Sequence, residues 1–145
     1  MGFEVTLKLD ASRTEMINTI RDFGGRLAKQ KGVGLFYFAG HGAQLAWRNF
    51  LIPVDAQIKS AGEIEAQGVD MDTLLTSLTR AKNPMNMVIL DACRDNPFGE
   101  VVALPQKGLS QVDAPPGTLL AYATAPGNTA ADGFGANGLY TENVL

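Results

Sequence analysis

Short apolar runs alternate along the chain with stretches in which apolar residues recur at helical spacing. Residues 33–39 and 85–90 are almost continuously apolar, which is typical of strands that are buried on both faces of a sheet. The strand candidates are residues 3–9, 33–39, 50–52, 85–90 and 118–123. Strands that alternate with amphipathic helices predict an α/β layer structure with a mostly parallel sheet.

The first helix is predicted to begin at a capping box. Ser12 and Glu15 have the spacing in which a serine oxygen caps the first turn and the glutamate reaches back to the cap. The apolar face behind this cap consists of Met16, Ile17, Ile20, Phe23 and Leu27. Gly24 and Gly25 interrupt the same helix, and each weakens it by about 1 kcal/mol relative to alanine.

A second helix is expected after residue 70 or 72. Either Asp70 or Asp72 can cap it, and leucines at helical spacing follow between residues 74 and 78. Residues 57–68 are polar and are predicted to be a loop. Residues 99–117 contain three prolines and are also predicted to be a loop, of a length that is usually functional or disordered.

The composition suits one compact domain and excludes some partners. Fifteen acidic and twelve basic residues give a net charge of −3, so nucleic acid or an anionic membrane is not an expected partner. No stretch approaches the roughly 20 apolar residues of a membrane helix. Without such a stretch we expect a soluble chain. A single cysteine excludes an internal disulfide, which leaves the compartment open between cytoplasm and periplasm. Because the chain starts in a strand candidate and ends in an apparent helix start, we expect residues 1–145 to be part of a longer protein.

The candidate chemistry lies where two apolar runs end. The run at 33–39 leads into His41, and the run at 85–90 leads into Cys93; these are the only histidine and the only cysteine in the chain. Ligands of open parallel sheets bind beyond the carboxyl ends of the strands. We therefore expect His41 and Cys93 to lie on the same edge of one sheet.

A histidine beside a cysteine can perform nucleophilic catalysis. The imidazole takes the proton of the thiol, the thiolate attacks, and the imidazole returns the proton to the leaving group. The backbone amides of Gly42 and Cys93 could donate to the developing oxyanion, where loss of one donor typically costs about 3–4 kcal/mol. Taken singly, His41 is more often a structural or exposed histidine, and Cys93 more often a small buried side chain; their joint placement favours the catalytic interpretation.

Three segments together resemble caspase-like cysteine peptidases. They are YFAGHG at 37–42, LIPVD at 51–55 and LDACRDNPF at 90–98. Positions 41 and 93 are 52 residues apart, near the roughly 50 of caspases. The segments AYATAPGN at 121–128 and GLYT at 138–141 are similar to the bacterial metacaspase, or orthocaspase, branch.

The resemblance implies a caspase-like three-layer αβα sandwich and a cysteine endopeptidase. It implies His41 as the base, Cys93 as the nucleophile that forms an acyl-enzyme, and an oxyanion hole near Gly42 and Cys93. It also implies that Asp91 receives a basic side chain, so that peptide or protein substrates are cut after Arg or Lys. By the same resemblance, we expect the family's first strand to precede Met1. The family's second acidic contact has no acidic counterpart at residues 125–128.

Several alternatives stay open. A catalytically inactive caspase-like interaction or signalling module has the same motifs, and a flavodoxin-like binder is disfavoured because no phosphate-binding glycine motif follows a strand. Metacaspases often have an acidic calcium loop; here the acids are spread out, and no metal or other cofactor is expected, with calcium as the alternative. Those acids are Asp55, Glu63, Glu65, Asp70 and Asp72. Lys107 is a candidate self-processing site if basic residues are preferred, with an ordinary flexible loop as the alternative. Asp55, Asp95 and Asn96 are expected in turns, although Asp55 could instead orient a loop near the site. Arg94 is expected in a salt bridge, with a substrate contact as the alternative.

Overall fold

The computed structural model describes residues 2–93, 96–99, 102–104 and 109–122. The elements in chain order are α1 (Arg13–Gln30), β1 (Val33–Leu45), β2 (Arg48–Ile52), α2 (Glu63–Gln67), β3 (Val69–Asp70), α3 (Met71–Ala81), β4 (Met85–Cys93) and β5 (Thr118–Tyr122). The α/β class is confirmed, and both long predicted helices form. The apolar runs at 33–39, 50–52, 85–90 and 118–123 each lie in a strand, with residue 123 outside the described residues.

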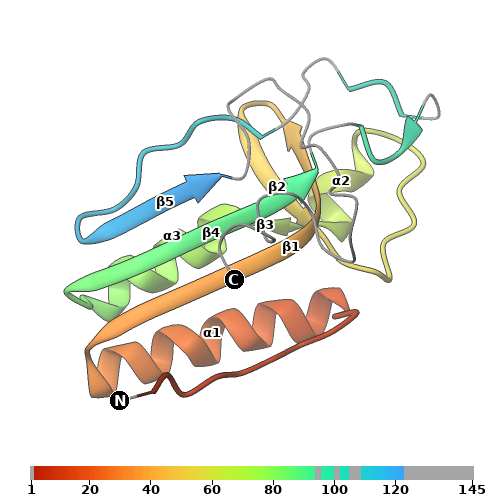
Figure 1. Cartoon of the computed structure of the whole chain (residues 1–145). Helices are drawn as coiled ribbons and strands as arrows, with labels where there is room; N and C mark the ends of the chain where they lie inside the picture. Colours follow the sequence, from red (N-terminus) through yellow and green to blue (C-terminus); the bar gives the residue numbers. More distant parts are fainter. Residues whose placement is uncertain (1, 94–95, 100–101, 105–108, 123–145) are drawn as a thin grey trace, which may run out of the picture.

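The sheet has the strand order β3-β2-β1-β4-β5. Its long ladders are parallel: β1 pairs with β4 from Val33 opposite Met85 to His41 opposite Cys93, and β4 pairs with β5. Antiparallel pairing of β2 with the end of β1, and of β3 with β2, extends the sheet at its other edge. The sheet is therefore mixed, with a parallel centre (Figure 1).

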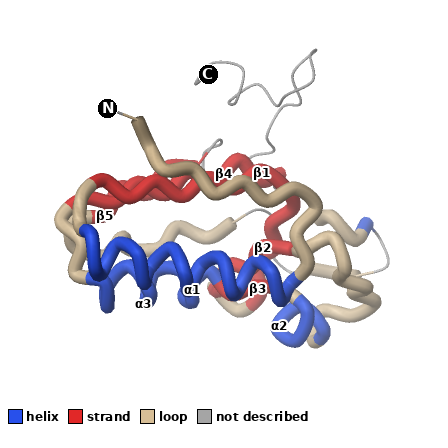
Figure 2. The backbone as a smooth tube through the Cα atoms, turned by 90° about the horizontal axis from the view of Figure 1, so that it is seen from below, coloured by secondary structure: helices blue, strands red, loops and turns tan. Residues whose placement is uncertain are grey.

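Helices α1 and α3 cover one face of this sheet (Figure 2). Alternate residues of β4, such as Val88 and Leu90, are buried in the core beneath them, as strand geometry requires. The other buried members of this core are Met16, Ile20, Leu27, Leu51, Val69, Met71, Leu74, Leu75, Leu78, Ala81, Ala92 and Leu109. On the opposite face, Val33 and Leu35 of β1 are exposed.

Helix α1 begins as its sequence predicts. The Ser12 side chain accepts from the Glu15 amide, and the Glu15 carboxylate accepts from the Ser12 amide, so the capping box is complete. The Ser12 amide and the Ser12 hydroxyl both donate to Glu15 Oε2, at 3.1 and 2.9 Å. These two bonds hold the pKa of the Glu15 carboxyl below its ordinary value, with the backbone bond contributing most. The cap fixes the start of α1, and the apolar face of the helix determines which side packs on the sheet.

The expected strand at residues 3–9 does not form. Residues 2–10 belong to no helix or strand, and the side chains of Phe3 and Leu9 are 60% and 77% exposed. The segment, which we call the N-terminal arm (residues 2–10), is held by Arg26, which donates to Glu4 Oε1 and Thr6 Oγ1 at 2.8 Å each. Alternation of apolar residues fits a strand only where a neighbouring strand supplies a ladder, and the arm lies against a helix instead.

One expected loop contains structure of its own. Residues 63–67 within the predicted loop 57–68 form α2, because Ile58 and Ile64 are buried against Phe50 in a second, smaller core. The described part of residues 99–117 contains no α-helix or strand, as predicted. It still contributes Val102 and Leu109 to the two cores, so this loop is partly fixed by packing.

Candidate active site

His41 and Cys93 are direct partners in the parallel ladder of β1 and β4. Neighbouring strands lie about 5 Å apart, so the backbones of these two residues are adjacent. His41 is exposed. Both residues stand within their strands, at the last pair of the ladder, and not in loops beyond the strands as the apolar runs suggested.

His41 is also the point at which β1 changes partners. It pairs with Cys93 of β4 on one side and with Ile52 of β2 on the other, and β1 continues along β2 as far as Leu45. The backbone at His41 is therefore held from both sides. Alternate residues of β1 bond to the strands on either side, and this pairing restricts the backbone around His41 far more than a loop would.

Asp91 lies two residues before Cys93, and its carboxylate is in contact with Tyr37. The Tyr37 hydroxyl donates to Asp91 Oδ2 at 3.3 Å. The register partner of Asp91 is Ala39, so Tyr37 reaches across from two residues earlier in β1. Tyr37, His41 and Asp91 share the face of the sheet opposite α1 and α3 by the two-residue alternation of strands. Sequence reasoning missed Tyr37, although its spacing of four residues from His41 places it on the same face.

Gly42 is buried at the start of the pairing with β2, opposite Leu51. A Cβ atom at this position would lie 2.9 Å from Leu109 Cδ2 and 3.3 Å from Ala92 Cβ. Both neighbours belong to the main core. The packing alone therefore favours glycine at position 42, independently of any role of its backbone amide in catalysis.

The hairpin of β1 and β2 is held by the segment after residue 108. Asn49 donates to the Ser110 carbonyl at 2.8 Å and accepts from the Ser110 amide at 2.7 Å. The Ser110 hydroxyl donates to the carbonyl of Trp47 at 2.8 Å. The hairpin that begins at His41 is thus fixed near its tip as well as at its base.

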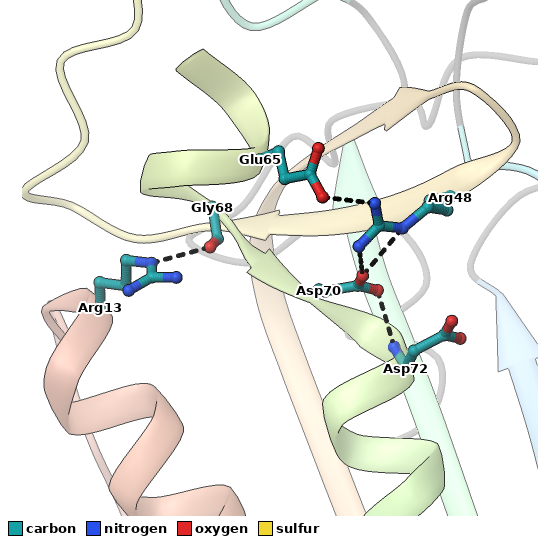
Figure 3. A network of polar contacts seen from close by, with 6 residues as sticks. All are labelled: Arg13, Arg48, Glu65, Gly68, Asp70 and Asp72. Carbon is teal, nitrogen blue, oxygen red and sulfur yellow. Dashed lines mark hydrogen bonds and ion pairs between the residues drawn. The ribbon is translucent and has the colours of Figure 1, made fainter. Parts of the chain in front are cut away.

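A polar network fixes the other side of the hairpin (Figure 3). Arg48 Nη1 of β2 donates to Glu65 Oε1 of α2 at 2.6 Å. Arg48 Nε donates to Asp70 Oδ2 at 3.0 Å, and Arg48 Nη2 donates to the same oxygen. Hydrogen bonds to Glu65 and then to Asp70 raise the pKa of the Arg48 guanidinium. Asp70 Oδ1 accepts from the Asp72 amide at 2.9 Å, so Asp70 is the residue that caps α3.

The acidic residues considered for calcium serve other contacts. Asp70 and Glu65 bind Arg48, and Asp55 Oδ1 accepts from the Arg13 amide at 2.9 Å, next to the start of α1. Asp55 lies in a turn after Pro53, as expected. Within the described ranges, no three or more His, Cys, Asp or Glu residues are grouped so that they could hold a metal ion.

Some predicted features cannot be compared with the structure. Arg94, Asp95, Lys107 and residues 125–128 lie outside the described residues. Asn96 forms a turn, in which its side chain accepts from the Phe98 amide at 3.1 Å and donates to the carbonyls of Gly99 and Val102. None of the helices that the structure describes has the length and apolar character needed to cross a membrane.

Comparisons with known proteins agree with the resemblance at the family level. The family model for the caspase domain matches residues 1–145. The chain is 29% identical over 129 residues to mucosa-associated lymphoid tissue lymphoma translocation protein 1 of Homo sapiens and to its homolog of Mus musculus. The matches cover 88% of this chain but only 15% and 14% of those proteins, so the chain spans about a seventh of the length of these curated relatives.

Proposed function

The chain belongs to the caspase-domain family, and on that premise we propose that it is a cysteine endopeptidase whose catalytic pair is His41 and Cys93. The observation that supports this proposal most directly is their pairing in the last register position of the β1–β4 ladder. Adjacent strands lie about 5 Å apart, so the backbones of the two residues are neighbours, and this supports the proposal that the imidazole and the thiol exchange a proton.

In the proposed reaction His41 takes the proton of the Cys93 thiol, and the thiolate attacks the carbonyl carbon of the scissile peptide bond. The tetrahedral intermediate collapses to a thioester, and His41 gives the proton to the leaving amine. Water, deprotonated by His41, then hydrolyses the thioester and restores the thiol. The backbones of both residues lie in paired strands, which would hold their positions during these steps.

The oxyanion would be stabilised by the backbone amides of Gly42 and Cys93. In an antiparallel ladder alternate residues direct their N–H groups toward the partner strand and away from it. The proposed role therefore requires Gly42 to be a residue whose N–H points away from β2, toward the end of β4. Loss of one such donor would cost about 3–4 kcal/mol of transition-state stabilisation.

We propose that substrates are peptides or proteins cut after Arg or Lys, as in the metacaspase branch. A carboxylate is the natural receptor for a guanidinium or an ammonium group. Asp91 is half-buried, two residues from Cys93 and on the face that carries His41. If basic residues are preferred, cleavage after Lys107 by another copy or by the same chain is a further consequence.

A second candidate function is that of an inactive interaction module. The face of the sheet opposite α1 and α3 carries exposed apolar side chains, and such a surface favours contact with another protein. These side chains are Val33, Leu35, Tyr37, Met85 and Leu119. The two functions differ in one property, since only the peptidase needs an activated thiol at position 93.

The test is labelling by a peptide electrophile that ends in Arg, with an Asp-ended probe beside it, followed by intact mass. Wild type, Cys93→Ala and His41→Ala are compared. Arg-selective labelling that is lost in both variants is expected. If wild type is not labelled by either probe, or if His41→Ala is labelled at the wild-type rate, the proposed catalytic pair is wrong. The same spectra show self-processing: a cut after Lys107 should appear in wild type and not in Cys93→Ala.

A further inference from the structure

A tyrosine hydroxyl donates a hydrogen bond to the carboxylate that is proposed to receive the substrate's basic side chain. Tyr37 donates to Asp91 Oδ2 across the β1–β4 ladder at 3.3 Å. The two residues are diagonal neighbours, because Tyr37 pairs with Ile89 and Asp91 pairs with Ala39. A diagonal pair on one face of a sheet is within reach of an aromatic side chain.

The small side chain of Ala39 makes this contact possible. Ala39 stands directly opposite Asp91 and carries only a methyl group. The ring of Tyr37, which stands on the same face two residues earlier, can therefore extend along the sheet toward Asp91. A tyrosine has only two rotatable side-chain bonds, so its hydroxyl constrains a neighbouring carboxylate at a smaller entropic cost than a long polar side chain would.

Both members of the pair are partly exposed. Tyr37 is 42% exposed, and Asp91 is half-buried at the end of the ladder that carries His41 and Cys93. An ionised carboxylate has about four acceptor sites, so a hydrogen bond from Tyr37 is compatible with a guanidinium on the same group. The hydroxyl restricts the orientation of the carboxylate before a cationic side chain arrives.

We infer that Tyr37 is a positioning residue for substrate selectivity: it orients Asp91 so that the carboxylate receives a guanidinium. This inference rests on the proposed function, because it assigns to Asp91 the basic side chain of the substrate. Tyr37 acts through Asp91 and takes no part in proton transfer. Its removal should therefore weaken the recognition of arginine and leave the reactivity of Cys93 unchanged.

The experiment measures binding without turnover. In the Cys93→Ala protein, a peptide ending in Arg and a matched peptide ending in norleucine are titrated by calorimetry or fluorescence anisotropy. Tyr37→Phe removes only the hydroxyl and keeps the ring. Because 3.3 Å is long for a hydroxyl–carboxylate hydrogen bond, we expect a moderate effect. The Kd for the Arg peptide should rise about 3- to 10-fold, and the Kd for the norleucine peptide should change less than about 2-fold.

Two comparisons separate positioning from a general loss of structure. In an Asp91→Asn background, Tyr37→Phe should cause no further loss of selectivity, because the group that it orients is already gone. Tyr122→Phe is the matched control: its hydroxyl also donates at 3.3 Å, to the Ser110 carbonyl, and its ring packs against the core on the helical side of the sheet. That variant should not change the ratio of the two Kd values.

The outcomes are distinct from those of the labelling test. The inference would be overturned if Tyr37→Phe lost affinity equally for both peptides, or if Tyr122→Phe lost as much selectivity for the Arg peptide. A parent protein that binds the two peptides equally would overturn it as well. If wild type is not labelled at Cys93 while the binding selectivity follows the expected pattern, the peptidase proposal fails and the recognition of arginine through Tyr37 and Asp91 stands.

Discussion

Gly24 and Gly25 are neighbours in α1 with opposite surroundings, and they give a sharp test of the packing of α1 on α3. A Cβ at Gly25 would meet no atom within 4 Å, whereas a Cβ at Gly24 would overlap Ser77 Oγ and lie 3.2 Å from Ser77 Cβ and 3.4 Å from the Ser77 carbonyl oxygen. Both substitutions by alanine gain about 1 kcal/mol of helix propensity. Only Gly24→Ala adds an overpacking cost of about 1–3 kcal/mol.

Only one of the two substitutions is therefore expected to stabilise the chain. Gly25→Ala should stabilise the chain by about 0.5–1 kcal/mol, and Gly24→Ala should be neutral to about 2 kcal/mol destabilising. In a chain of this length 1 kcal/mol corresponds to a Tm shift of about 2–4 °C. Adding Ser77→Ala to Gly24→Ala removes the overlapping hydroxyl and should recover part of the loss.

Urea unfolding followed by circular dichroism measures these differences as shifts of the midpoint at constant slope. Gly25→Ala is the matched control, since it makes the same chemical change one residue away. If Gly24→Ala stabilises the chain as much as Gly25→Ala, the two helices do not cross as closely as the structure has them. If Ser77→Ala gives no recovery in the Gly24→Ala background, the cost at that position has another origin.

The remaining predictions concern caps, pH, the N-terminal arm and calcium. Asp70→Ala removes the cap of α3 and a partner of Arg48 and should cost about 1–2 kcal/mol in urea unfolding, whereas Asp72→Ala should cost less than about 1 kcal/mol; equal costs would contradict the cap. Because the pKa of Glu15 is lowered in the folded chain, its contribution is present above its unfolded pKa and is lost as pH falls through the folded value, so the urea midpoint of Glu15→Gln should fall less than that of wild type between pH about 6 and about 3. Arg26→Ala removes the hydrogen bonds to the arm and should speed its proteolysis, read by mass, without a change in the urea midpoint. Labelling of the thiol at position 93 should be equal in calcium and in a chelator, and a requirement for calcium would refute the absence of a cofactor.

Local patterns predicted the elements whose causes are local. The capping box at Ser12 and Glu15 sets the start of α1, and the apolar runs place the first residues of β1, β4 and β5. The predicted strand 33–39 was too short because the six residues after it include two glycines and a histidine, which carry no strand pattern. They extend β1 as far as Leu45 because β2 folds back on them, and no local signal reports a partner strand.

The N-terminal arm shows the opposite error. Its alternating apolar residues fit a strand, but a strand exists only where another backbone supplies the ladder. In the structure its polar residues bond to Arg26 of α1 instead. Tyr37 was missed for the same reason, that a local pattern does not report the partner strand. Its contact with Asp91 depends on the register between β1 and β4.

The juxtaposition of His41 and Cys93 depends on register, and register is set at the other end of the strands. Val33 and Met85 are partners at the start of the ladder, and His41 and Cys93 each stand eight residues further on. Equal lengths bring the two residues level, while an insertion of one residue in either strand would move one of them to the opposite face of the sheet. The sequence contained this information as equal separations of eight residues, from the start of one apolar run to His41 and from the start of the other to Cys93. It could be used only after the parallel pairing of those runs was assumed. The rule that ligands bind beyond the carboxyl ends of parallel strands predicts which edge of the sheet holds the site. The pairing of Val33 with Met85 at the start of the ladder determines that the histidine and the cysteine meet at that edge.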